Sequence, residues 1–189
     1  IHKITYSELV DMGIISGNIA SNQIAIFGNG GGMLSETNSD PRPDDLQEVS
    51  ILVADGNDGT FDDGDYLLFY AQGPHTWNFN ESDNSFSHQY NIYSLKAYYF
   101  ICTNAGIGEK KRILKQDNSS LTATQTINTF KHYQFYENDV KNFGESGRHW
   151  FDEGFDMVTQ RNYTLTIPPL TPAGGKLIVN AGSTTSSTS

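Results

Sequence analysis

Short hydrophobic stretches, separated by segments rich in glycine and asparagine, recur through most of this chain. The clearest lie at residues 23–27, 49–53, 66–70 and 98–103. Runs of this length, bounded by turn residues, are typical of β-strands. Residues 98–103 are apolar or aromatic at nearly every position, which predicts a central strand of a sheet.

Looser versions of the same pattern predict further strands at residues 111–114, 126–136, 162–167 and 176–180. The apolar positions of 126–136 also fit a helical repeat, but its β-branched and aromatic residues favour an extended strand. The last two ranges surround a proline- and glycine-rich break. We expect them to be the opening strands of a second, incomplete β domain over residues 158–189.

One short helix is predicted near the start of the chain. Thr5 and Glu8 have the spacing of a capping box, and Leu9, Met12 and Ile14 form an apolar stripe behind it. The predicted fold class is therefore mainly β. It is an antiparallel β-sandwich-like domain with one or two short helices, followed by the first strands of a second β domain.

Composition narrows the functional classes. Hydrophobic residues make up 37% of the chain and charged residues 18%, with 10 Tyr, 11 Phe and 2 Trp. This profile is typical of β-rich, exported proteins. The net charge of −10 argues against nucleic acid and anionic membranes as partners. No apolar run approaches the roughly 18 residues of a membrane-spanning helix.

No catalytic residue is predicted. Cys102 is the single cysteine, which excludes an internal disulfide, and its strand-like surroundings favour a small buried hydrophobe over a reactive thiol. The five histidines lack the paired spacing of a zinc site. Ser146 and His149 are close in sequence, but no strained nucleophile turn accompanies them.

A glycine-rich run at residues 28–32 follows the strand predicted at 23–27. Such a run suggests a phosphate-binding loop, but no Lys-Ser or Lys-Thr pair follows it and no helix is predicted there. A close crossing of two backbone segments, or a wide turn, is the favoured interpretation.

The most acidic segment, residues 55–65, contains five aspartates and three glycines between the strands predicted at 49–53 and 66–70. Calcium binds six to eight oxygens, and carboxylates on a glycine-rich turn can converge on it. The candidate ligands of a structural Ca²⁺ are Asp55, Asn57, Asp58, Asp62, Asp63 and Asp65. The segment departs from an EF-hand loop, because Thr60 and Tyr66 replace the required glycine and glutamate. A solvated turn whose aspartates accept from their own backbone remains the alternative.

A cluster of aromatic residues raises a second functional class. Exposed rings on a β-sandwich can stack against sugars while Asn and Asp side chains bind the hydroxyls. The candidate rings are Trp77, Phe79, Phe86, Tyr90 and Tyr93. A carbohydrate- or surface-binding module is therefore an alternative function, and burial of most of these rings in a core is the competing interpretation.

Seven phrases together resemble a known family. They are IHKITY (1–6), FGNGG (27–31), DDLQE (44–48), DYLLFYAQGP (65–74), NIYS (91–94), YYFI (98–101) and SGRHWF (146–151). In this order they resemble the region ahead of the peptidase domain in the family of the type IX secretion sortase PorU and the gingipain-type cysteine peptidases. The resemblance spans about residues 1–157, and the co-occurrence of the phrases carries it.

The resemblance implies a role and a location. It implies that residues 1–157 form an N-terminal, non-catalytic module that positions or docks a downstream peptidase domain. It also implies that this module lacks the strand that would precede Ile1. The parent protein would be a cysteine endopeptidase acting on C-terminal sorting signals of secreted cargo. The implied location is the periplasm or outer-membrane surface of a Gram-negative bacterium. The implied partners are the peptidase domain, other secretion-system envelope proteins and cargo C-terminal domains.

Overall fold

The computed structural model describes residues 1–106, 108–114, 116, 122–142, 145, 147, 149–155, 157–172 and 174–183. The chain folds into two compact units. Unit 1 comprises Ile1–Thr76 and Tyr93–Leu121, and unit 2 comprises Trp77–Ile92 and Thr122–Ser189. Each unit is thus assembled from two separated stretches of chain. The predicted boundary after residue 157 stays a prediction.

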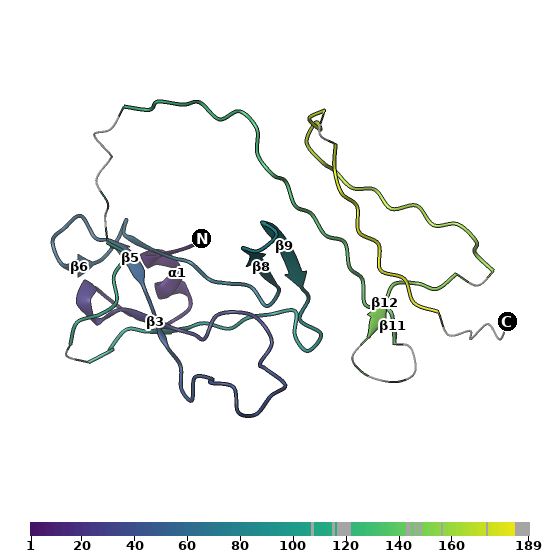
Figure 1. The fold of residues 1–189 in the computed structure, drawn as a ribbon. Helices are drawn as coiled ribbons and strands as arrows, with labels where there is room; N and C mark the ends of the chain where they lie inside the picture. Colours follow the sequence, from purple (N-terminus) through teal and green to yellow (C-terminus); the bar gives the residue numbers. More distant parts are fainter. Residues whose placement is uncertain are drawn as a thin grey trace. The chain divides into compact units, whose positions relative to one another are not determined.

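The elements are short and mostly β, as Figure 1 shows. The helices of unit 1 are α1 (Tyr6–Asp11) and the 3₁₀ helix η1 (Ser21–Gln23). Its strands are β1 (His2–Thr5), β2 (Ile19–Ala20), β3 (Ala25–Phe27), β4 (Glu48–Val49), β5 (Ile51–Ala54), β6 (Thr60–Phe61), β7 (Tyr66–Phe69) and β10 (Phe100–Cys102). Unit 2 contains β9 (Ser85–Gln89), β11 (Lys141–Asn142), β12 (Trp150–Phe151) and all but the first residue of β8 (Thr76–Asn80). With 23% strand and 6% helix, the mainly antiparallel β class is confirmed.

The first sheet of unit 1 is built around β7, which lies between β1 and β5 with both pairings antiparallel. Burial alternates along β7, so Leu67 and Phe69 face the core while their neighbours are half-buried. This alternation follows from the two-residue period of a strand. Val53 of β5 and Ile4 of β1 both pair with Leu67, so three aliphatic side chains lie side by side in register.

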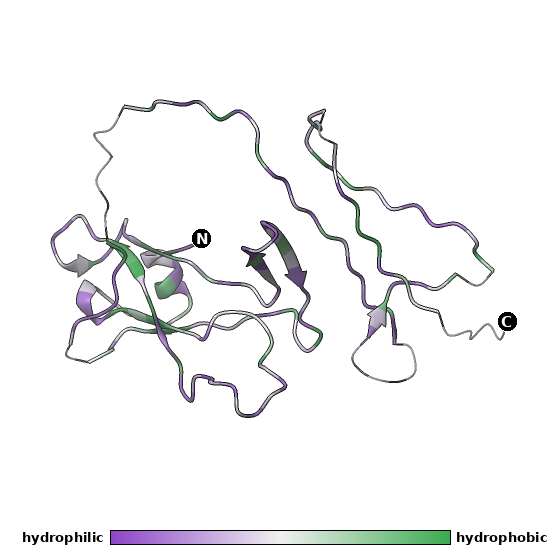
Figure 2. Cartoon of the chain, viewed as in Figure 1, coloured by the Kyte–Doolittle hydropathy of each residue, from purple (hydrophilic) through white to green (hydrophobic). Residues whose placement is uncertain are grey.

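The second sheet has the order β10-β3-β4, and its strands are also antiparallel. Only Ser50 separates β4 from β5, so the chain passes directly from the second sheet into the first. A strand that changes sheets in this way forms a corner between them. Figure 2 colours β5, which follows this corner, as strongly hydrophobic.

Both sheets contribute to one hydrophobic core. Its buried side chains all come from the first stretch of unit 1, and Tyr99 and Ile101 of the second stretch pack against them. The buried set is Leu9, Ile15, Ile24, Ile26, Ile51, Phe61, Leu67 and Phe69. Among the described residues, every hydrophobic side chain that is fully buried belongs to unit 1. Unit 1 therefore has the two-sheet, single-core arrangement expected of a sandwich-like domain.

The helix begins as predicted. Thr5 caps α1, accepting from the Glu8 backbone N–H at 3.3 Å, and the Glu8 side chain accepts from the Thr5 backbone N–H at 2.7 Å. The predicted apolar stripe is only partly correct. Leu9 is buried, but Met12 is 61% exposed because α1 ends at Asp11, and Ile15 enters the core instead.

Several predicted strands are corrected by the structure. Within the predicted strand 98–103, only Phe100–Cys102 form a strand, β10, which lies at the edge of its sheet beside the central strand β3. Residues 111–114 make only an isolated parallel bridge, Arg112 beside Ile51. The described residues of 126–136, 162–167 and 176–180 form no strand. A strand requires a hydrogen-bonded neighbour, and hydrophobicity alone cannot supply one.

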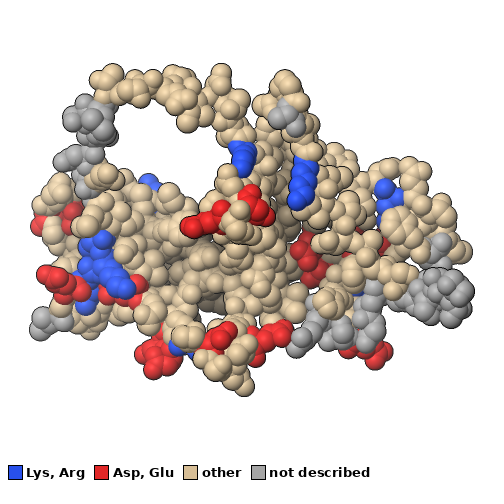
Figure 3. Space-filling model, viewed as in Figure 1, with Lys and Arg blue, Asp and Glu red and all other residues tan. Residues whose placement is uncertain are grey.

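Among the described residues, no helix is long and apolar enough to cross a membrane. On the face drawn in Figure 3, Lys and Arg side chains lie scattered among several separate groups of acidic side chains.

Candidate functional site

The acidic segment is held by its own side chains. Asp55 Oδ1 accepts from the backbone N–H of Asn57 at 3.1 Å, and Asp58 Oδ1 accepts from that of Thr60 at 2.8 Å. Asp65 Oδ2 accepts from the N–H of Asp62 at 2.8 Å. These are the local turns in which aspartate satisfies a nearby amide. Three of the predicted calcium ligands are thus used to shape the segment.

This segment is not one continuous loop. Its middle forms β6, which pairs with β2, and Phe61 of β6 is fully buried. The N–H of Ser21 donates to the carbonyl of Gly59 at 3.0 Å, and the N–H of Tyr6 donates to that of Asp65 at 3.0 Å. Residues 55–65 were expected to remain outside the core, yet they contribute Phe61, one of the largest side chains of that core.

The predicted calcium site remains a prediction. No group of three or more His, Cys, Asp or Glu side chains placed to hold a metal occurs in the described part of the chain, which includes all of residues 55–65. Desolvation raises the pKa of Asp62, as do the charges of Asp65, Asp58 and Asp63 in that order. The carboxylates thus repel one another without converging on one point.

Calcium binding would stabilise the folded chain, so we expect a rise in melting temperature with millimolar Ca²⁺ that a chelator reverses. Differential scanning calorimetry, with Mg²⁺ as the control ion, measures this directly. Identical melting temperatures with Ca²⁺ and with chelator would exclude the site.

A polar cluster connects the acidic segment to η1. The guanidinium of Arg112 donates to the carbonyls of Ser21 at 2.9 Å and Ile24 at 3.0 Å. Burial lowers the pKa of Arg112, while the charges of Glu48 and Asp55 oppose that shift. Arg112 stays charged at any physiological pH. It therefore acts here as a fixed donor that closes the end of η1.

Asp55 belongs to the same cluster. The buried Oγ of Ser21 lacks a hydrogen bond of good geometry, yet it lies close enough to Asp55 to be the main cause of a lowered pKa at that carboxyl. Desolvation partly opposes this effect, and the N–H of Asn57 adds to it. Ionised Asp55 is therefore favoured in the folded state.

We expect Asp55→Asn to destabilise the chain at pH 7 by about 0.5 kcal/mol, a small value because solvent screens this half-buried group. The folded-state pKa lies below the unfolded one. The stabilisation is therefore complete above the unfolded value of about 3.9 and is lost as the pH falls through the lowered pKa. Urea unfolding from pH 3 to pH 7 should show the two stabilities converging at acid pH. Asp44→Asn, at an exposed position, is the control, and a pH-independent difference for Asp55→Asn would contradict the assignment.

Four of the five aromatic candidates lie on or directly beside the β8–β9 hairpin. Trp77 contacts His88, Tyr133 and Phe135 edge-on, at centroid distances of 4.9, 6.3 and 5.8 Å. Phe79 and Phe86 contact each other at 4.9 Å. Trp77, Phe79 and Phe86 remain 42%, 50% and 43% exposed, and Tyr93 is 74% exposed but belongs to unit 1. Four of the five predicted rings thus share unit 2, and sugar binding by them stays a prediction.

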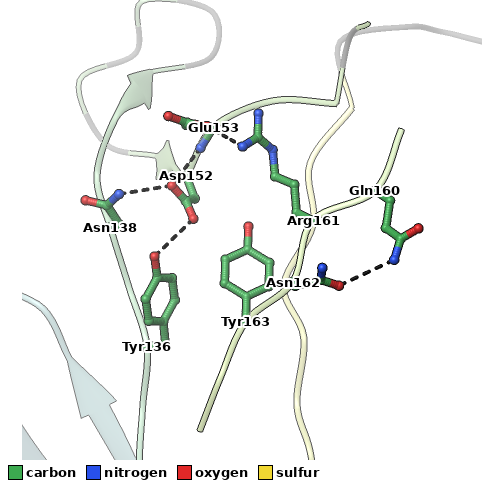
Figure 4. Close-up of a pocket in the computed structure, with 8 residues that line it drawn as sticks. All are labelled: Tyr136, Asn138, Asp152, Glu153, Gln160, Arg161, Asn162 and Tyr163. Atoms are coloured by element: carbon green, nitrogen blue, oxygen red, sulfur yellow. Dashed lines mark hydrogen bonds and ion pairs between the residues drawn. The ribbon is translucent and has the colours of Figure 1, made fainter. Parts of the chain in front are cut away.

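A second site, which the sequence did not indicate, lies in unit 2. It is an open hollow of about 420 Å³, lined by Tyr136, Asn138, Asp152, Glu153 and residues 160–163 (Figure 4). Three separate stretches of sequence form it, residues 136–138, 152–153 and 160–163. All three carry polar side chains and two of them also carry a tyrosine, but only folding reveals that they face one hollow.

The hollow is organised by Asp152. This carboxylate accepts from Asn138 Nδ2 at 3.0 Å, from the Glu153 N–H at 2.8 Å and from the Tyr136 hydroxyl at 3.4 Å. The Glu153 N–H is the main cause of a lowered pKa at Asp152, which desolvation partly opposes and the Tyr163 hydroxyl reinforces. Figure 4 shows both tyrosine hydroxyls directed toward the carboxylate side of the hollow.

Cys102 is half-buried on β10, where it pairs with Ala25. The predicted strand position is thus correct, burial is only partial, and the predicted lack of thiol reactivity stays a prediction. Of the Ser146 and His149 pair, Ser146 lies outside the described residues, as does Arg148 of the same phrase.

No protein-family model matches this sequence, and no curated protein matches it either. Among solved structures, the chain is similar to the crystal structure of dimeric latent PorU from Porphyromonas gingivalis, at 30% sequence identity and a TM-score of 0.44. The match covers 61% of this chain and 9% of that chain. The chain thus spans about a tenth of the length of that protein.

Proposed function

We propose that this chain is a non-catalytic module of a gingipain-type, PorU-like cysteine endopeptidase of the bacterial cell envelope. In this proposal it positions or docks the peptidase domain that follows it. The peptidase would act on C-terminal sorting signals of secreted cargo, at the periplasmic or outer-membrane surface of a Gram-negative bacterium. Other envelope components and cargo C-terminal domains are its proposed partners.

The observation that carries this proposal is the contact between the phrases of the resemblance. Gly31 of FGNGG crosses the backbone of Gly73 in DYLLFYAQGP, and the Gly32 N–H next to it donates to the Pro74 carbonyl at 3.0 Å. The Tyr99 hydroxyl of YYFI donates to the Gln72 carbonyl at 3.0 Å. Three phrases that are far apart in sequence thus meet at one place, which we call the glycine crossing (Gly31, Gln72–Pro74 and Tyr99).

Two more phrases attach to the same structure. IHKITY supplies β1, which pairs with β7 along its whole length. DDLQE lies beside FGNGG, because the Gly28 N–H donates to the Gln47 carbonyl at 2.9 Å and the Gln47 N–H donates to Asn29 at 3.0 Å. Phrases that build one fold must contact one another. The five therefore act as a packing set, which supports a structural module over a catalytic one.

The coding sequence beyond Ser189 provides the decisive test. We expect it to encode a caspase-like α/β domain with a paired Cys and His. Isothermal titration calorimetry should then detect binding between this chain and that domain expressed separately. A stop codon or an unrelated domain after Ser189 would refute the family proposal. An encoded peptidase domain that does not bind would refute the docking role alone.

A further inference from the structure

We propose that the hollow around Asp152 in unit 2 binds a neutral, polyhydroxylated ligand of the carbohydrate class. This proposal is independent of the proposed family, because it rests only on the groups that line the hollow. Its volume of about 420 Å³ is within the range of small-molecule sites.

Aromatic surface is available on one side. The rings of Tyr136 and Tyr163 lie 5.1 Å apart between centroids and are tilted by 59°. They are 56% and 48% exposed, so ring surface remains for a ligand to contact. Flat apolar rings beside polar groups suit a pyranose, which has C–H faces and a rim of hydroxyls.

The charges of the lining disfavour an ionic ligand. The lining contains Asp152, Glu153 and one cation, Arg161, so it carries one net negative charge and repels anions. The carboxylates are also already engaged. Asp152 accepts hydrogen bonds from Tyr136, Asn138 and the Glu153 N–H, and the Tyr163 hydroxyl also approaches it. Together these donors use the roughly four acceptor sites of a carboxylate. Glu153 is paired with Arg161. A ligand cation would thus find no uncommitted carboxylate.

Uncharged donors and acceptors remain for a ligand. Desolvation, and then Asp152, raise the pKa of both tyrosines, so both stay protonated and keep an acceptor lone pair on the phenol oxygen. At the rim, Gln160 Nε2 donates to Asn162 Oδ1 at 3.4 Å. Each of the two amides has further donor and acceptor positions that a ligand can use. In the described part of the chain the buried Nε of Arg161 has no hydrogen-bond partner. Hydroxyl groups both donate and accept, so they match this mixed set.

The test uses the whole 189-residue chain and ¹H–¹⁵N correlation spectra. The probes are neutral glucose, galactose, mannose, N-acetylglucosamine and maltose, with glucuronate and arginine methyl ester as charged comparisons. We expect saturable shifts at pocket residues with at least one neutral sugar. No saturable shift with any neutral sugar, or tighter binding of a charged probe, would overturn the proposal.

Substitutions then locate the site. Tyr163→Ala should weaken sugar binding about tenfold by removing ring contact. Asn162→Ala, at an exposed position, should weaken it about fivefold through one lost hydrogen bond. Tyr70→Ala, which removes an exposed tyrosine of unit 1, should leave it unchanged. Binding that is lost on Trp77→Ala but unaffected by Tyr163→Ala and Asn162→Ala would place the site on the β8–β9 hairpin and refute this one.

Discussion

Gly31→Ala is expected to destabilise unit 1 by about 4 kcal/mol or more, at the upper end of measured single substitutions. A Cβ at this position would lie 1.4 Å from the carbonyl oxygen of Gly73 and 2.4 Å from its carbonyl carbon. Neither atom belongs to a flexible side chain, so two backbone segments would have to separate. That movement would disturb the hydrogen bond from the Gly32 N–H to the Pro74 carbonyl. Urea unfolding followed by far-UV circular dichroism measures the loss.

The opposite side of the glycine crossing supplies a matched control. A Cβ at Gly73 would have no atom within 4 Å. Gly73→Ala should therefore change the free energy of unfolding by no more than about 0.5 kcal/mol. Equal losses of unfolding free energy for the two substitutions would show that the backbones at Gly31 and Gly73 are not in close contact. A mild effect of Gly31→Ala would also weaken the proposed packing role of the resemblance phrases.

Phe61→Ala should cost about 3–5 kcal/mol, the range for a fully buried phenylalanine. Phe61 is completely buried within the core, and its ring lies 5.9 Å from that of Tyr6. Removing its ring leaves a cavity in the core, among side chains that are distant from one another in sequence. Chemical denaturation should show a lower midpoint with an unchanged slope, because the unfolded state is the same.

Phe100→Ala is the control for this substitution. Phe100 also lies on a strand of unit 1, but it is 54% exposed. Its truncation should cost no more than about 1 kcal/mol, since most of its surface already contacts water. If Phe61→Ala were as mild as Phe100→Ala, the acidic segment would not contribute to the core. The interpretation of that segment as a solvent-exposed turn would then return.

Some features of the fold are local and could be predicted from the sequence. The β class, the capping box at Thr5 and the close crossing at residues 28–32 are local consequences of composition and spacing, and all three occur in the structure. A glycine run indicates that backbones can approach, but it does not name the partner. The partner is Gly73, which is 42 residues from Gly31 along the chain, and only tertiary contacts bring the two together.

Candidate chemistry was less predictable. The acidic segment attracted a calcium prediction because five aspartates are close in sequence, whereas their side chains in the structure satisfy neighbouring backbone amides. The hollow around Asp152 attracted no prediction. Its lining is divided among stretches that individually look like ordinary polar coil, and no local spacing signals that Tyr136 and Tyr163 share it.

The sequence by itself determined the mainly β class, the start of the helix and the segment where one backbone can pass close to another. These features depend on each residue and its neighbours within a few positions. Only the tertiary structure decided that β10 is an edge strand, that Phe61 enters the core and that 126–136 forms no strand. Strand order, burial within a loop and the shape of a hollow all depend on contacts between residues distant in sequence. No local pattern in the sequence specifies those contacts.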